Sequence, residues 1–252
     1  MRFLNKTVVV TGATSGLGLS LVKALQKEGA NLVLVARREE LLAEIAKGTG
    51  AIYLPYDLED APERLAEWVI DQCGKVDVLI NNAGFGEFSM LDDVTVETIE
   101  SMNRINVLSP VRLTKALLPA MPTGGMVINI ASQAGKLPTP KSTIYCMTKA
   151  AMIQFSNALR LELKPRGIHV MTVNPGPIAT AFFKRADLSG KYEGSVASIV
   201  LSPDHLAVQV VQSAMRRKRE LNAPWWMEAS AKLYAVAPRI VEWIGKSGFD
   251  KK

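Results

Sequence analysis

Residues 7–18 read TVVVTGATSGLG, an apolar β-branched run followed at once by a glycine-rich turn and the start of a helical pattern. Glycines at such a turn let the backbone approach a bound pyrophosphate, and the first amides of the next helix attract negative charge. The spacing is Gly-x-x-x-Gly-x-Gly rather than the Gly-x-Gly-x-x-Gly of other dinucleotide folds. A glycine-rich turn without a ligand is the alternative, but the position after the first strand favours a nucleotide.

The rest of the chain alternates short β-rich runs with longer helical patterns. We expect strands at residues 7–11, 31–36, 51–56, 76–81, 126–131 and 169–174, and helices at residues 17–28, 39–46, 62–73, 96–121 (broken near Pro110) and 142–163. Several strands are almost entirely apolar, as in a parallel sheet covered on both faces. The alternation predicts an α/β fold, a Rossmann-type doubly wound parallel sheet flanked by helices on both faces. Because no linker or repeat interrupts residues 1–252, we expect a single domain.

The pattern changes after the sixth strand. Residues 177–201 show little periodicity and are expected to form a substrate loop. A helix at 203–217, a short apolar stretch near Leu221 and a helical tail at about 225–252 follow, with a helix from Glu228 towards Ile244 interrupted at Pro238.

Three tryptophans of this tail, Trp225, Trp226 and Trp243, lie near lysines. A membrane-surface or dimer patch is one interpretation of them. We expect instead that an ordinary C-terminal helix buries them.

Composition narrows the class of protein. The chain is 48% hydrophobic and 21% charged, which is ordinary for a globular protein. Cys73 and Cys146 form neither a disulfide framework nor a metal-ligand spacing. There is no signal-peptide pattern at the start, and no apolar run reaches the roughly 18 residues of a membrane span. We therefore expect a reduced cytoplasmic protein without a membrane span.

The net charge of +6 has one dense source, the basic run at residues 216–219. This run falls at the end of an expected helix, where cations complement the helix dipole. No recognised nucleic-acid module accompanies it, so we expect no nucleic-acid partner.

The end of the second expected strand reads VARR at residues 35–38, with no acidic residue at the turn. A carboxylate there would bind the ribose 2′-hydroxyl of NAD(H). Guanidinium groups suit a 2′-phosphate instead. Arg37 and Arg38 therefore predict NADP(H), unless they are merely exposed residues at a helix start.

A possible proton-transfer group consists of Ser132, Tyr145 and Lys149. A tyrosine and a lysine four residues apart lie on one face of a helix. The ammonium favours the phenolate, and a phenol so placed beside a serine hydroxyl can protonate a carbonyl oxygen or deprotonate an alcohol. Because Tyr-x-x-x-Lys is common by chance, its meaning depends on the rest of the chain.

Six motifs occur in the same order as in one enzyme family. They are the Thr-Gly-x-x-x-Gly-x-Gly turn at 11–18, Asn81-Asn82-Ala83-Gly84 after the fourth strand, Asn106 in the middle helix, Ser132 after the fifth strand, Tyr145-x-x-x-Lys149, and Asn174-Pro175-Gly176 after the sixth. Together they resemble the short-chain dehydrogenase/reductase family across essentially the whole chain. The sequence looks most like its branch of uncharacterised bacterial oxidoreductases related to carbonyl, steroid and retinol dehydrogenases.

The resemblance implies hydride transfer between a nicotinamide and a carbonyl or alcohol, with no metal. Tyr145 would be the general acid and base, Ser132 would bind the substrate oxygen, and Lys149 would bind the nicotinamide ribose and favour the ionised Tyr145. Asn106 would hold a water in a proton relay. The implied cofactor contacts are Gly12, Thr14, Ser15, Gly16, Leu17, Gly18, Arg37, Arg38, Asp57, Leu58, Asn82, Ala83, Gly84, Tyr145, Lys149, Pro175, Gly176, Ile178 and Thr180, with Asp57 alternatively a helix N-cap.

The substrate is less defined. An apolar cleft is one interpretation of Phe85, Phe88, Phe182, Phe183 and Tyr192, and plain packing is the other. Relatives that reduce 3-oxoacyl groups commonly end in a strand with paired glycines, whereas residues 221–226 read LNAPWW. We expect a small or apolar carbonyl substrate and a homodimer or homotetramer. A 3-oxoacyl reductase and a non-catalytic dinucleotide sensor remain alternatives, the second disfavoured by the intact catalytic residues.

Overall fold

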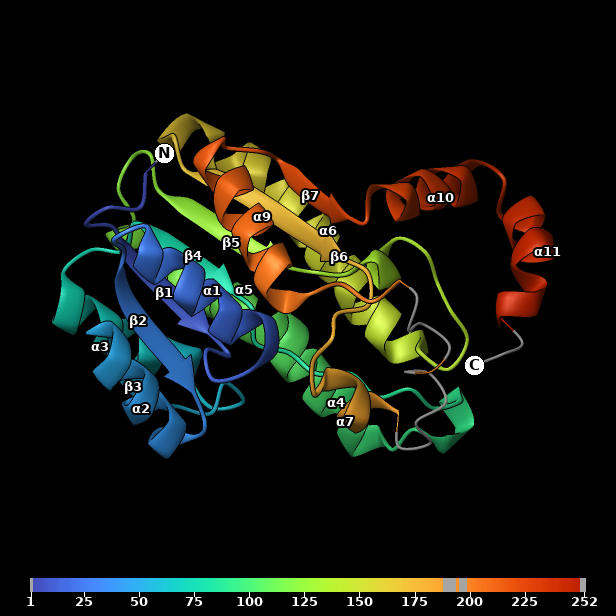
Figure 1. The fold of residues 1–252 in the computed structure, drawn as a ribbon, viewed down its shortest axis with the longest axis horizontal. Helices are drawn as coiled ribbons and strands as arrows, with labels where there is room; N and C mark the ends of the chain where they lie inside the picture. The colour runs from blue at the N-terminus through green and yellow to red at the C-terminus, as the bar shows by residue number, and fades with distance from the viewer. Residues whose placement is uncertain (1, 188–193, 195–198, 250–252) are drawn as a thin grey trace.

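The computed structural model describes residues 2–187, 194 and 199–249 (Figure 1). One sheet contains seven parallel strands in the order β3-β2-β1-β4-β5-β6-β7. They are β1 (Thr7–Thr11), β2 (Asn31–Ala36), β3 (Ile52–Pro55), β4 (Val78–Asn81), β5 (Met126–Ile130), β6 (His169–Pro175) and β7 (Glu220–Ala223). The strand order reverses between β1 and β4, the place where open α/β sheets bind ligands. The predicted doubly wound fold is confirmed.

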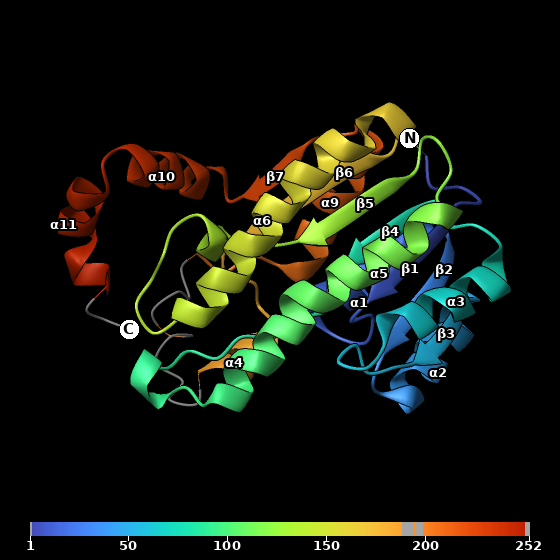
Figure 2. The ribbon, with the colours of Figure 1, turned by 180° about the vertical axis from the view of Figure 1, so that it is seen from behind.

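Helices cover both faces of the sheet (Figures 1 and 2). On one face lie α1 (Gly16–Lys27), α2 (Glu39–Thr49) and α9 (Pro203–Met215), and on the other α3 (Pro62–Cys73), α5 (Ser109–Leu117) and α6 (Thr143–Leu163). In β1, Val8 and Val10 enter the first core and Val9 the second, each fully buried. Two covered faces explain why the strands are apolar at nearly every position.

The other described helices are between three and twelve residues long. They are η1 (Leu91–Asp93), α4 (Val96–Asn103), η2 (Arg104–Leu108), η3 (Leu118–Ala120), η4 (Gln133–Gly135), η5 (Lys164–Arg166), α7 (Phe182–Ala186), α10 (Trp225–Val236) and α11 (Pro238–Phe249). Within the described residues, no helix is both long enough and apolar enough to cross a bilayer.

The middle helix is not broken near Pro110, contrary to expectation. Its backbone stays helical from α4 through the π-helical turn η2 into α5, and Pro110 lies in the first turn of α5. Proline has no amide for the carbonyl four residues earlier, and its ring clashes with that carbonyl. A wider π-helical turn just before the proline accommodates both effects, and such turns are frequent at functional sites.

The part after β6 contains more structure than its sequence predicted. The predicted substrate loop contains α7 and a bridge between Ile178 and Leu201, while residues 188–193 and 195–198 lie outside the described part. The apolar stretch near Leu221 is the edge strand β7. The tail helix begins at residue 225, three residues earlier than expected.

The predicted burial of the tail tryptophans is wrong. Trp225, Trp226 and Trp243 are 77%, 40% and 79% exposed. The two tail helices extend away from the sheet, as both ribbon views show (Figures 1 and 2). Because α10 buries the side that carries Ala231, its tryptophans have no core to enter.

Candidate active site

A cavity of about 650 Å³ lies beyond the carboxyl ends of β1, β4, β5 and β6. This volume is typical of small-molecule and cofactor sites. Its wall includes Ser132 and every residue predicted to contact the cofactor, namely Gly12, Thr14, Ser15, Gly16, Leu17, Gly18, Arg37, Arg38, Asp57, Leu58, Asn82, Ala83, Gly84, Tyr145, Lys149, Pro175, Gly176, Ile178 and Thr180. Of the predicted site residues, only Asn106 lies behind the wall.

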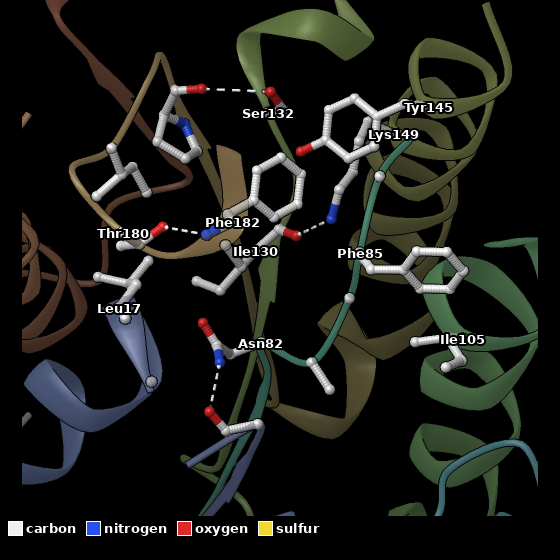
Figure 3. A pocket seen from close by; sticks show the side chains of 18 of the residues that line it. Leu17, Asn82, Phe85, Ile105, Ile130, Ser132, Tyr145, Lys149, Thr180 and Phe182 are labelled. Carbon is white, nitrogen blue, oxygen red and sulfur yellow. Dashed lines mark hydrogen bonds between the residues drawn. The ribbon is translucent and has the colours of Figure 1, made fainter. Parts of the chain in front are cut away.

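The turn between β1 and α1 cannot hold side chains at its glycines. Gly12 has φ +67°, and a Cβ on Gly18 would lie 2.1 Å from the carbonyl oxygen of Gly12. The Thr11 hydroxyl accepts hydrogen bonds of 3.0 Å from the amides of Asn82 and Ala83. The Asn82 side chain in turn donates to the Thr11 carbonyl at 2.9 Å (Figure 3). Asn82 thus ties the turn to the end of β4, a contact that sequence reasoning missed.

The first turn of α1 carries backbone amide hydrogen-bond donors. Ser15 occupies the N-cap position, and its side chain makes no capping hydrogen bond to this helix. The first amides of a helix lack partners within the helix, and they attract phosphate. A glycine cradle beside these amides fits a dinucleotide pyrophosphate.

The two arginines after β2 line the same cavity in different ways. Arg38 donates to the carbonyl oxygen and to the hydroxyl of Thr14, at 3.2 and 3.0 Å. Arg37 is 62% exposed, with its guanidinium 3.7 Å from the Asp57 carboxylate. The Asp57 carboxylate also accepts from the Glu59 amide at 3.0 Å. Asp57 therefore stabilises a turn and is not the N-cap of α3, which is Ala61.

Ser132 and Tyr145 enter the cavity from adjacent elements. Ser132 follows β5 in an extended conformation, where its hydroxyl accepts from the Ala134 amide at 3.0 Å and donates to the Pro175 carbonyl at 3.4 Å. The Tyr145 ring lies in the first turn of α6 and packs against Phe182, with ring centroids 5.6 Å apart. Close packing therefore fixes the tyrosine ring in the wall of the cavity (Figure 3).

Lys149 lies one turn further along α6 and is 5% exposed. Its ammonium donates to the Ile130 carbonyl at 3.0 Å and lies 5.7 Å from the centroid of the Tyr145 ring (Figure 3). Burial lowers the pKa of Lys149 to about 8. Among the described residues, no carboxylate forms an ion pair with Lys149. The site therefore keeps a buried cation that is still mostly protonated at neutral pH.

Asn106 supports the wall from behind. It lies in η2, donates to the Phe85 carbonyl at 2.8 Å and to the Thr148 hydroxyl at 3.1 Å, and accepts from the Phe85 amide at 3.0 Å. A Cβ on Gly84 would lie 2.8 Å from the Asn106 side-chain oxygen. Asn106 thus fixes the loop after β4 against α6, and its part in a water relay stays a prediction.

Other lining residues were not predicted. Ile130 contributes a main-chain carbonyl, which no side-chain pattern marks, and Met227 enters the wall from α10. Of the proposed aromatic cleft, Phe85, Phe88, Phe182 and Phe183 line the cavity, whereas Tyr192 lies outside the described residues.

Comparison with known proteins shows the family of the chain. The family model described as short chain dehydrogenase matches residues 6–189. Ketoacyl reductase HetN of Nostoc sp. is 31% identical, covering 98% of this chain and 92% of that protein.

Two solved structures resemble the fold. One is a short-chain dehydrogenase/reductase of Burkholderia phymatum in complex with NAD, at 22% identity and TM-score 0.87, covering 95% of this chain and 96% of that one. The other, a short-chain dehydrogenase of Burkholderia cenocepacia in complex with NADP, has 25% identity and TM-score 0.80, covering 88% and 97%. From its family match, its relatives and its fold, the chain belongs to the short-chain dehydrogenase/reductase family of oxidoreductases.

Proposed function

We propose that the protein is an NADP(H)-dependent oxidoreductase that interconverts a carbonyl and an alcohol. The observation that carries the proposal is the shared cavity, in which Ser132, Tyr145 and the buried Lys149 lie beyond the same strand ends as the glycine turn. The bound nicotinamide supplies or accepts the hydride. The side chains of the protein bind, orient and move the proton.

Tyr145 gives its proton to the substrate oxygen during reduction and takes it back during oxidation. Ser132 donates a hydrogen bond to the same oxygen and holds it against the tyrosine hydroxyl. The Lys149 ammonium favours the ionised phenol because an opposite charge nearby stabilises an anion. The ring of Phe182, packed against Tyr145, keeps the phenol in place.

The chemistry of the lining residues also indicates which of them would bind each part of the cofactor. The glycine turn and the first amides of α1 would hold the pyrophosphate. Arg37 and Arg38 would bind the 2′-phosphate, because planar guanidinium groups match phosphate oxygens. A kcat/KM higher with NADH than with NADPH would refute this choice.

The decisive experiment is a panel of ketones, aldehydes and hydroxysteroids followed by NADPH absorbance. We expect turnover with apolar carbonyls, because Phe85, Phe88 and Phe182 line the substrate side of the cavity. Tyr145→Phe should lower turnover by several orders of magnitude and leave NADPH affinity nearly unchanged. If no carbonyl or alcohol reacts while NADPH still binds, a dinucleotide sensor becomes the better function.

A second candidate is reduction of 3-oxoacyl groups, favoured by the likeness to a ketoacyl reductase. Adding a 3-oxoacyl thioester to the panel separates the two. A kcat/KM for the thioester well above that for every simple ketone would select this candidate. We also propose a homodimer or homotetramer in the cytoplasm, and sedimentation equilibrium tests the assembly.

A further inference from the structure

The helix α10 has two unlike sides. Its inner side carries Ala231, which is 5% exposed, and Met227, which lines the cavity and touches Gly176. Trp225, Leu233 and Val236 are 77%, 51% and 86% exposed. At about 100° per residue these three lie within an arc of roughly 80°, on the side opposite Ala231. An apolar stripe thus faces solvent.

A half-buried ion cluster fixes this orientation. Lys136 donates to the carboxylates of Glu228, in α10, and Glu220, in β7, at 2.7 and 2.8 Å. All three side chains are at most 24% exposed. Turning the apolar stripe inward would break the ion pair between Glu228 and Lys136 and leave Glu220 as the one carboxylate of this cluster on the buried ammonium, which is costly.

The next helix, α11, also exposes apolar side chains. In α11, Ile240 and Trp243 are 56% and 79% exposed and lie three residues apart, on neighbouring positions of the helix surface. We call residues 225–249 the C-terminal arm, which extends beyond the sheet in both ribbon views (Figures 1 and 2). Apolar side chains gathered on one arc of α10, with two more exposed on α11, favour an interaction site over scattered surface residues.

The charges beside the stripe are mainly basic. Lys232 is 77% exposed, with its ammonium 3.9 Å from the Glu228 carboxylate, and Arg239 is also exposed. The acidic residues are engaged, since Glu228 binds Lys136 and Glu242 accepts from the Tyr234 hydroxyl at 3.0 Å. By sequence the arm contains three Lys and Arg against two Asp and Glu, and residues 250–252 add two Lys and one Asp.

We propose that the C-terminal arm docks on an anionic lipid surface and lies in its interface. Tryptophans settle at the level of lipid headgroups, and cations beside an apolar helix face are attracted to anionic lipids. The chain has a net charge of +6, so an anionic lipid surface complements the basic residues of the arm better than a second copy of the chain does. The same helix supplies Met227 to the cavity wall, so docking would bring the cavity next to the lipid. This proposal does not depend on the proposed reaction.

The test is co-sedimentation of the full chain with vesicles of phosphatidylcholine containing phosphatidylglycerol, compared with phosphatidylcholine alone. We expect binding to the anionic vesicles, weakened by salt because exposed charges are screened. Trp225→Ser and Trp243→Ser should each weaken binding by about tenfold, the loss expected when one large apolar side chain leaves the interface. Tryptophan fluorescence should shift to shorter wavelength on binding in the wild type.

Leu161→Ser is the matched control, because Leu161 is 73% exposed but lies near the C-terminal end of α6, outside the arm. It should leave vesicle binding unchanged. Circular dichroism and NADPH binding, neither of which uses the exposed tryptophans, check that each variant is folded. Absence of binding to anionic vesicles overturns the proposal. The proposal is also overturned if neither the wild type nor Trp225→Ser binds vesicles, but the wild type self-associates and Trp225→Ser does not. The arm would then be a surface between copies of the chain.

Discussion

Two buried charged side chains, Asp77 and Lys149, lie at opposite ends of the parallel strands, and their hydrogen-bond and ion-pair partners differ in kind. At the amino edge, next to β4, Asp77 is 1% exposed and is bound by Lys6 at 2.9 Å, Lys75 at 3.5 Å and the Thr7 amide at 3.1 Å. At the carboxyl edge, Lys149 is 5% exposed, with a carbonyl as the acceptor of its 3.0 Å hydrogen bond.

Their pKa values respond accordingly. Burial alone would raise the pKa of Asp77, but the hydrogen bonds from Lys6 and Thr7 and the nearby lysine charges bring it below its ordinary value. Burial of Lys149 meets no such compensation and lowers its pKa to about 8. One edge of the sheet therefore stabilises the fold, while the other keeps a costly charge where the proposed chemistry needs it.

The strongest test of this difference between the two buried charges is the variant Lys149→Met. We expect turnover to fall by about a hundredfold to ten-thousandfold, because the phenol loses the cation that favours its ionised form. The same change should raise the free energy of unfolding at pH 7 by roughly 3 kcal/mol, since a pKa lowered from 10.5 to about 8 corresponds to a cost of that order. Urea unfolding and initial-rate assays measure the two effects.

Lys136→Met is the matched control for the predicted effect of Lys149→Met on stability. Lys136 is also largely buried, at 16% exposure, but it is paired with two carboxylates. Its loss should destabilise the protein, because the largely buried carboxylates of Glu220 and Glu228 would keep only the exposed cations of Arg219 and Lys232, at 3.8 and 3.9 Å. If both lysine variants destabilise the fold, the contrast between paired and unpaired buried charge is wrong.

The pH dependence of stability tests the same cost in the wild type. Below pH 8 the folded protein carries the buried Lys149 charge and the full cost. Between about pH 8 and 10.5 the folded state has lost this proton while the unfolded state still holds it, so the Lys149 contribution to stability rises with pH. The stability advantage of Lys149→Met should therefore shrink across this window, as unfolding at a series of pH values would show. An advantage that stays constant to pH 10.5 would contradict the lowered pKa.

Much of the fold follows from local patterns. The bounds of β1, β2 and α3 were predicted to the residue, since each is a clear apolar run or amphipathic repeat flanked by turn or proline signals. The strand β7 was missed as a strand because its four residues, ELNA, are half polar. Its strand identity comes from pairing with β6, more than forty positions earlier in the chain.

The site was predictable in its residue types but not in its contacts. Tyr145 and Lys149 share a helix face by spacing alone, whereas the acceptor for Lys149 is a main-chain carbonyl on another element. The exposure of Trp225 and Trp243 could not be predicted from the sequence either. Periodicity identifies the apolar side of a helix, but only the tertiary structure decides whether anything covers it.

Asp77→Asn examines the paired charge at the amino edge. We expect the free energy of unfolding to fall by about 2–4 kcal/mol, because hydrogen bonds to a charged group and two nearby cations lose their anion. Turnover of the folded enzyme should not change, since Asp77 lies at the edge away from the cavity. The loss should fade as pH falls below the ordinary Asp pKa of 3.8, because protonation of Asp77 removes the same stabilisation from the wild type. Unfolding curves at neutral and acidic pH give both values.

The smallest expected effect concerns a third kind of charge, exposed and weakly paired. Arg37 is 62% exposed and lies 3.7 Å from Asp57, so Arg37→Ser should change stability by less than about 0.5 kcal/mol. Its proposed partner is the 2′-phosphate, and losing one charge-assisted hydrogen bond should lower kcat/KM for NADPH by about tenfold. The value for NADH should stay the same, because NADH has no phosphate at that position. Equal losses with both cofactors would show that Arg37 shapes the turn after β2 rather than reading the phosphate, and would leave Arg38, held on Thr14, as the remaining arginine for that role.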